Sequence, residues 1–129
     1  MSSEALHEET DRLGPHAIDQ HRAIVSLMEE LEAVDWYNQR AQATSNLELR
    51  AILEHNRDEE KEHAVMVLEW LRRHDSKLSE HLRTFLFTEA PITEIEAETD
   101  AGGASDDETS ANGLPTGSLG IGSLRPETK

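Results

Sequence analysis

Two long stretches of this sequence have the apolar periodicity of an α-helix, and together they constrain the fold more than any other feature. The first, from His16 to about Gln42, contains no glycine or proline. Its apolar residues recur three or four positions apart: Ile24, Leu27, Met28, Leu31 and Val34. The second ends near His74 and repeats the pattern: Leu49, Ile52, Leu53, Ala64, Val67, Leu68 and Leu71. The spacing predicts two long helices, each with one apolar stripe.

The segment between these stretches, "ATSN" at residues 43–46, consists of turn-forming residues and offers an N-cap for the second helix. Because so short a connection joins neighbouring helices, we expect an antiparallel hairpin. The stretch "SKLSEHLRTFLFTEAP" predicts a third, shorter helix, with Ser76 or Ser79 as its cap and Pro91 as its stop. The predicted fold class is all-α: a two-helix hairpin plus a short C-terminal helix.

Composition argues that one copy of the chain cannot build a large core. The sequence has 129 residues, of which 36% are apolar and only 4% aromatic, so we expect the chain to form oligomers. A formal net charge of -15 argues against binding nucleic acid or an anionic membrane, and it concentrates cations near the surface. The absence of cysteine excludes disulfides and thiolate metal sites. With no long apolar run and no secretory signal, the expected location is the cytoplasm.

The ends of the chain differ in amino-acid composition from the predicted helical domain at residues 15–95. Residues 1–14 are polar and predicted to be flexible, and residues 96–116 read as a disordered acidic linker. The last segment, residues 117–129, regains apolar side chains at Leu119, Ile121 and Leu124. These are either remnants of a frayed tail or a short linear motif that docks into grooves on a partner.

Three ionisable side chains interrupt the apolar stripes. Glu60 and His63 share a helix face with Leu53, Ala64 and Val67, and on the first helix Glu30 shares a face with the apolar stripe that includes Leu27 and Val34. Charges placed on a buried stripe need pairing or a metal ion. The Glu-x-x-His spacing is typical of helical di-iron carboxylate sites, in which a glutamate from a neighbouring helix faces the pair. One chain supplies half of such a site, so two chains related by a two-fold axis would complete it.

The spacing alone leaves alternatives open. A single Glu-x-x-His is often a local ion pair or a core histidine, and Glu4 with His7 matches the pattern by chance in the polar N-terminus. Periodicity prefers Glu60 as the ligand but does not exclude Glu59 or Glu62. Carboxylates with one imidazole per metal suit iron and leave positions open for oxygen.

Four segments together resemble one protein family, the encapsulated ferritins of bacterial encapsulin nanocompartments. They are "HRAIVSLMEELEAVDWYNQR", "HNRDEEKEHAVMVLEWLRR", "HLRTFLFTEAPI" and the terminal "GSLGIGSLR". The resemblance covers about residues 16–95 and the tail. It implies a ferritin-like four-helix bundle formed by two chains, an annular decamer built from such dimers, and a ferroxidase that oxidises Fe(II) to Fe(III) for mineral storage inside an encapsulin shell in the bacterial cytoplasm.

The resemblance also assigns roles to individual residues. Glu30, Glu60 and His63 resemble the di-iron ligands, where calcium or zinc is expected to be able to replace iron in crystals, and Tyr37 resembles the tyrosine beside that centre. Glu29, Glu32 and Trp36 resemble the outer metal site through which iron approaches. Leu119, Ile121 and Leu124 resemble the residues that hold the cargo to the shell. The outer residues and Tyr37 have ordinary alternatives: a solvated acidic face for Glu29 and Glu32, an interface anchor for Trp36 and a core position for Tyr37.

Two other functions remain open at this point. The chain could be a metal-stabilised assembly or a cargo adaptor without redox turnover. A haem-binding bundle would need an inward-pointing axial ligand, for which Met28 or Met66 could be suggested. Nothing else in the sequence supports haem.

Overall fold

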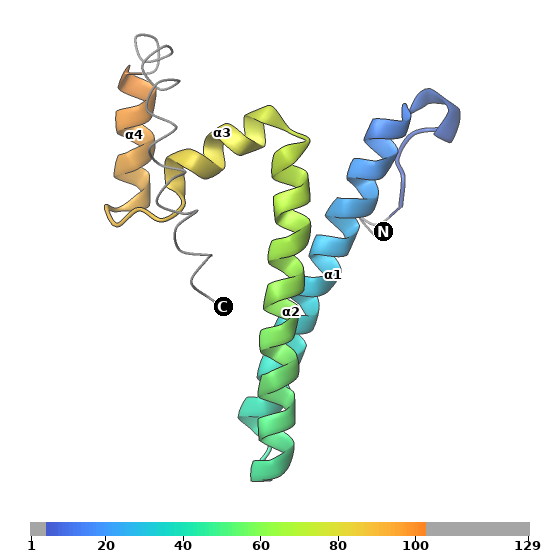
Figure 1. Ribbon diagram of the computed structural model, residues 1–129, viewed down its shortest axis with the longest axis vertical. Coiled ribbons are helices and arrows are strands. Elements are labelled where there is room, and N and C mark those ends of the chain that lie inside the picture. Colours follow the sequence, from blue (N-terminus) through green and yellow to red (C-terminus); the bar gives the residue numbers. More distant parts are fainter. Residues whose placement is uncertain (1–4, 103–129) are drawn as a thin grey trace, which may run out of the picture. The chain divides into compact units, whose positions relative to one another are not determined.

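The computed structural model describes residues 5–102, and every regular element in this part of the chain is helical (Figure 1). A short 3-10 turn, η1, is followed by four α-helices: η1 Thr10–Arg12, α1 Pro15–Ala43, α2 Leu47–Arg73, α3 Ser76–Phe85 and α4 Ile92–Gly102. The prediction of an all-α chain built on a helical hairpin is confirmed. The two-chain bundle and the decamer concern assembly, which a single chain does not test.

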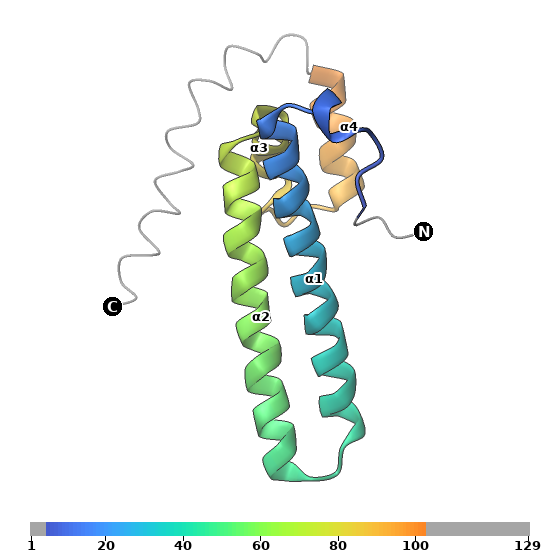
Figure 2. The same cartoon turned by 90° about the vertical axis from the view of Figure 1, so that its right-hand side faces the viewer.

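The hairpin begins and ends where its sequence provides terminating residues. Pro15 occupies the first turn of α1, where its missing N–H costs nothing. At the other end, the backbone N–H of Thr44 donates to the carbonyl of Arg40, and the Asn46 side chain accepts a hydrogen bond of 2.9 Å from the N–H of Leu49. Asn46 therefore caps α2. Figure 2 shows the two helices side by side, joined by this three-residue turn.

The two helices pack along each other but bury little apolar surface within one chain. The Arg57 guanidinium donates to the Asn38 side chain at 3.0 Å, and the Gln20 amide donates to the carbonyl of His74 at 3.2 Å. Among the described residues, the buried apolar side chains are Ala41, Ala64 and Leu71. Many large apolar residues on α1 and α2 stay exposed: Ile24, Met28, Leu31, Trp36, Leu47, Leu49, Ile52, Val65 and Met66. One copy therefore leaves much of its apolar surface uncovered, as its composition suggested.

The cap of α3 differs from the prediction. The side chain of Asp75 accepts a hydrogen bond of 3.0 Å from the N–H of Leu78, so Asp75 caps the helix and neither Ser76 nor Ser79 does. Ser79 is instead buried, with its hydroxyl accepting a hydrogen bond of 3.1 Å from Arg72. Asp75 is the cap because it directly precedes the first helical residue, where a carboxylate reaches the free N–H groups.

The region after α3 also corrects the sequence analysis. Phe87 adopts a φ of 61°, in the left-handed region, just beyond the end of α3. Pro91 was expected to stop a helix, but its carbonyl accepts hydrogen bonds from the N–H groups of Glu94 and Ile95, so it begins α4. The prediction of a disordered linker from residue 96 was wrong for residues 96–102, which are helical. The rest of that linker and the tail lie outside the described residues.

The chain divides into two units, residues 1–80 and 81–129, and α3 spans their boundary. The hairpin belongs to the first unit and α4 to the second. The short turn η1 lies in the N-terminal segment that was predicted to be flexible, and the predicted domain limits themselves stay predictions. In the described part of the chain, no helix combines the length and apolar character needed to cross a membrane.

Candidate metal centre

Glu30, Glu60 and His63 come together across the hairpin. Glu30 lies midway along α1, and the other two lie one turn apart on α2. Nδ1 of His63 is 3.3 Å from Oε1 of Glu60 and 3.6 Å from Oε1 of Glu30. One ligand atom from each residue lies within 4.8 Å of the other two, the separation at which three groups can share a metal ion. The structure thus brings together the three residues that the helical spacing selected.

The cluster is partly exposed to solvent. The side chain of Glu30 is 28% exposed, that of Glu60 is 23% exposed and that of His63 is 45% exposed. The two carboxylates are therefore more buried than the imidazole. Such a position would let ligands from outside the chain complete the set at the edge of the hairpin.

The charges in the cluster are not balanced within one chain. The pKa of the Glu30 carboxyl is raised above its ordinary value by a hydrogen bond with Glu60, by partial burial and by the negative charge of Glu60. His63 acts in the opposite direction but does not reverse the shift. Two carboxylates that repel each other beside an imidazole form a donor set that a divalent cation would neutralise, so these residues fit a metal such as iron.

Two residues that the sequence analysis did not single out tie the helices together beside the cluster. Arg57 lies one turn before Glu60, and its guanidinium reaches Asn38 on α1 while also pairing with Asp58 at 2.9 Å. The Arg57 side chain is only 19% exposed. The sequence could have pointed to Arg57 through its spacing of three residues from Glu60, which places Arg57 on the inner face of α2.

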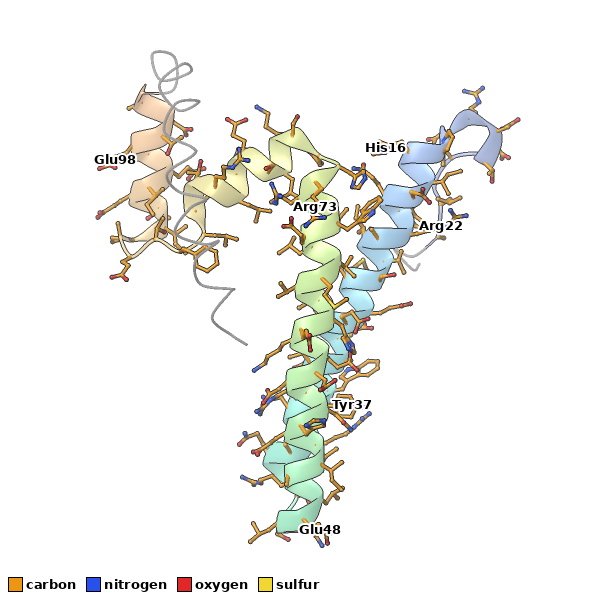
Figure 3. The ribbon with its side chains drawn as sticks, viewed as in Figure 1. His16, Arg22, Tyr37, Glu48, Arg73 and Glu98 are labelled. Carbon is orange, nitrogen blue, oxygen red and sulfur yellow. The ribbon has the colours of Figure 1, made fainter. Side chains whose placement is uncertain are left out.

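Tyr37 follows Glu30 by two turns on the same face of α1 and is half-buried, as labelled in Figure 3. Its ring lies beneath the guanidinium of Arg40, which is 5.5 Å from the ring centroid. This contact fixes the ring by a cation–π interaction. The contact that the structure gives Tyr37 within one chain is thus with Arg40 and not with the cluster of Glu30, Glu60 and His63.

Glu29, Glu32 and Trp36 lie along one exposed stripe of α1, apart from the face of Glu30. Trp36 borders a shallow pocket that it shares with Gln39 and Arg40. Neither glutamate lines that pocket. The structure therefore keeps the three residues on one side of the helix without joining them into a cluster.

The alternative ligands on α2 take other positions. The carboxylate of Glu59 lies 3.7 Å from Nε2 of His55, and both Glu59 and Glu62 are exposed. Within residues 5–102, the Glu30, Glu60 and His63 cluster is the one group of three or more such side chains with metal-binding geometry. Glu4 and the predicted docking residues Leu119, Ile121 and Leu124 lie outside the described residues.

Comparison with known proteins gives a consistent family. The profile of the EncFtn-like family matches residues 5–89. An encapsulated ferritin-like protein of Rhodospirillum rubrum is 60% identical over 98% of this chain and 92% of its own length. A ferritin-like protein of Thermotoga maritima is 54% identical over 78% of this chain and 88% of its own.

A more distant relative and a solved structure are also similar to this chain. An encapsulin nanocompartment cargo protein of Myxococcus xanthus is 33% identical over 74% of this chain and 76% of its own. A crystal structure of a protein from Nitrosomonas europaea superposes with a TM-score of 0.66 at 57% identity, covering 68% of this chain and 97% of that one. From the hairpin, the cluster it carries and these matches, we conclude that the chain belongs to the EncFtn-like family of encapsulated ferritin-like proteins.

Proposed function

We propose that this protein is a ferroxidase that oxidises Fe(II) to Fe(III) at a di-iron centre formed between two copies of the chain. The observation that carries the proposal is the cluster of Glu30, Glu60 and His63, whose ligand atoms lie within 4.8 Å of one another. Family membership supports it, because relatives are described as ferritin-like. Fe(II) is the substrate, and dioxygen is the electron acceptor.

Completion of the centre by a second copy follows from the ligand count. One chain offers two carboxylates and one imidazole, which is half of the set found in helical di-iron carboxylate proteins. His63 shares its helix face with Met66 and Trp70, and Met66 is exposed. A copy related by a two-fold axis would cover these apolar side chains and bring its own three ligands to the same place.

The ligand types favour iron and oxidation. Carboxylate oxygens stabilise the ferric more than the ferrous state, and a single imidazole per metal keeps coordination positions open. Each Fe(II) gives up one electron, so a pair of ions delivers two electrons to dioxygen. The residues of this chain would bind the iron and compensate its charge. A cation between Glu30 and Glu60 would relieve the repulsion between their carboxylates.

The roles of the outer residues are carried over from the resemblance. Glu29, Glu32 and Trp36 would form the outer site through which iron approaches, and their shared exposed stripe on α1 is compatible with that role. A net charge of -15 would draw Fe(II) to the surface. Tyr37 would lie beside the centre once two chains meet.

A larger ring needs a second contact surface on each chain. Ile24, Met28 and Leu31 form an exposed apolar stripe on α1 that differs from the face of Glu30. Burial of this stripe against a further copy would let dimers assemble into the decamer that the resemblance implies. Native mass spectrometry of the full chain measures that stoichiometry.

Encapsulation is the second part of the proposal. Relatives are described as an encapsulated protein and as an encapsulin nanocompartment cargo protein. We infer that this chain associates with an encapsulin shell in a bacterial cytoplasm and that Leu119, Ile121 and Leu124 in the C-terminal peptide make the contact. Mineral would then collect inside the shell.

Stopped-flow absorbance and oxygen consumption after aerobic Fe(II) addition test the activity. The wild-type protein should produce a ferric signal and consume oxygen, whereas His63→Ala should lose both. Glu62→Ala is the matched control, because Glu62 precedes His63 on the exposed side of α2. Equal oxidation by the wild type and His63→Ala would contradict the assignment of the site.

The alternative of a non-catalytic metal-stabilised assembly has its own outcome in the same experiment. If Glu60→Ala abolishes dimerisation while the wild type consumes no oxygen, the metal closes the interface without turnover. For the tail, deletion of residues 117–125 should leave oxidation intact and abolish co-purification with a co-expressed shell protein. Retained encapsulation would refute the docking role of that peptide.

A further inference from the structure

A pair of histidines lies at the open end of the hairpin, opposite the turn that connects α1 and α2. His16 is in the first turn of α1, and His74 directly follows α2. Their ring centroids are 6.3 Å apart, with the ring planes inclined by 39°. Figure 3 labels His16 at the start of α1 and Arg73 at the end of α2. Neither histidine belongs to the carboxylate cluster at the middle of the hairpin.

The protonation pattern of His74 follows from its hydrogen bond. Its Nδ1 lies 2.8 Å from the backbone carbonyl oxygen of Trp70. Because a carbonyl oxygen only accepts, Nδ1 must carry the hydrogen, and in the neutral ring the lone pair is on Nε2. A metal-binding histidine is commonly oriented in this way, with one nitrogen donating to a carbonyl and the other free for the metal.

The orientation of the His74 ring is also fixed. The ring stacks on the indole of Trp70, with centroids 4.0 Å apart and planes inclined by 20°. Gln20 on α1 donates to the backbone carbonyl of His74 at 3.2 Å, which fastens this residue to the opposite helix. His74 therefore presents a free nitrogen from a constrained ring, although the residue itself is exposed.

The spacing of the two rings lies at the wide limit for a shared ion. With a zinc–nitrogen bond of about 2.05 Å and a further distance of about 1.1 Å to the ring centre, two imidazole centroids lie about 5.1 Å apart at a tetrahedral angle and about 6.3 Å apart when opposed. The observed 6.3 Å equals the opposed arrangement and is about 1.2 Å wider than the tetrahedral spacing that zinc prefers. Because His16 is exposed, its side chain is free to rotate and shorten this separation to that of tetrahedral geometry.

We propose that His16 and His74 bind one Zn²⁺ ion, with water completing its coordination, and that this ion clamps the start of α1 to the end of α2. Two imidazoles select a borderline ion such as zinc, unlike the oxygen-rich cluster of Glu30 and Glu60. The negative charge of the protein raises the local concentration of cations. The clamp closes the end of the hairpin that lies opposite the turn between Ala43 and Leu47.

The test uses the full chain carrying Glu60→Ala, so that the carboxylate cluster is disrupted, and titrates it with ZnCl₂ by calorimetry. Adding His16→Gln or His74→Gln should weaken zinc binding by about tenfold or more, as loss of a ligand requires. Adding His81→Gln should leave the affinity unchanged, because this exposed histidine is on α3 and outside the pair. Circular dichroism confirms that each variant is folded. Because His16 is exposed, the His16→Gln substitution is the least able to disturb the helices.

Nitrogen NMR of the seven imidazoles supplies a second readout that a mere packing role would not move. On adding zinc to the same chain, Nε2 of His74 should shift while its Nδ1 keeps the signal of a protonated nitrogen. Zinc affinity that survives both substitutions, or an unshifted Nε2 of His74, would overturn the proposal. Ferroxidase activity measured with His16→Gln alone should equal that of the wild type, which separates this site from the proposed function.

Discussion

Replacing Glu30 with glutamine should stabilise the metal-free protein while removing its response to iron. The carboxylate oxygens of Glu30 and Glu60 lie within 4.8 Å of each other, and the pKa of Glu30 is raised, chiefly through its contact with Glu60. Two unit charges at this distance repel by about 0.9 kcal/mol in water and by about 3.5 kcal/mol at a protein-like dielectric constant of about 20. Because both side chains are partly exposed, the lower value is the better guide.

A raised carboxyl pKa makes the folded state less stable above that pKa than below it. Glu30→Gln should therefore gain about 1 kcal/mol at pH 8 in the presence of a chelator, a rise in Tm of about 4 to 8 °C. The gain should shrink as the pH falls through the raised pKa and disappear near pH 3, well below the ordinary pKa of 4.5, where Glu30 is protonated in both states. Thermal unfolding followed by circular dichroism at fixed protein concentration measures both values.

The control is Glu62→Gln, which removes the same charge from an exposed position on α2 and should change stability by less than about 0.5 kcal/mol. Anaerobic Fe(II) should raise the Tm of the wild type and of Glu62→Gln but not that of Glu30→Gln. The reasoning fails if Glu30→Gln is less stable than the wild type in chelator, or if iron stabilises it as much as it stabilises the wild type.

Three further substitutions probe the scaffold. Asn46→Ala removes the cap hydrogen bond to Leu49 and should cost about 1 kcal/mol in urea unfolding, with a smaller loss for Asn46→Ser. Leu71→Ala opens a cavity at a buried position and should cost about 2 to 4 kcal/mol in the same assay, whereas exposed Val65→Ala should cost far less. The Glu69 carboxylate pairs with Arg72 and then Arg73, which lowers its pKa from 4.5 to about 2, so its contribution is present above pH 4.5 and is lost as the pH falls towards 2. Since that side chain is 39% exposed, the contribution is discounted to about 1 kcal/mol, and a Glu69→Gln variant should show a flatter stability profile between pH 4.5 and 2.

The hairpin and the cluster of Glu30, Glu60 and His63 could be predicted from the sequence because both depend on helical periodicity. Apolar residues three and four apart set the inner faces of α1 and α2, and the polar turn located the cap at Asn46. Once the two helices were antiparallel neighbours, Glu30 had to lie near Glu60 and His63. Periodicity favoured Glu60 but left Glu59 and Glu62 open, and the structure distinguishes them because both lie exposed on α2 outside the cluster.

The helix α4 could not be predicted by the same criterion. Its large apolar residues are only Ile92 and Ile95, so its sequence shows no long apolar stripe, and none of its residues is buried. Local features explain it instead: the carbonyl of Pro91 accepts the first two hydrogen bonds, and Glu94 lies in the first turn, where a negative charge is favourable. The contacts of Arg57 with Asn38 and of Arg72 with Ser79 also escaped prediction, because long side chains reach across elements in ways that spacing does not specify.

The central claim is that two copies of this chain hold iron between them through Glu30, Glu60 and His63. A crystal structure of the full-length protein soaked anaerobically with Fe(II) tests it most directly, with anomalous scattering to place the metal. We predict two irons on a two-fold axis or flanking it, each bound by carboxylates from both chains and by one imidazole. Iron bound by residues of one chain alone, or these three side chains facing bulk solvent without metal, would contradict the account.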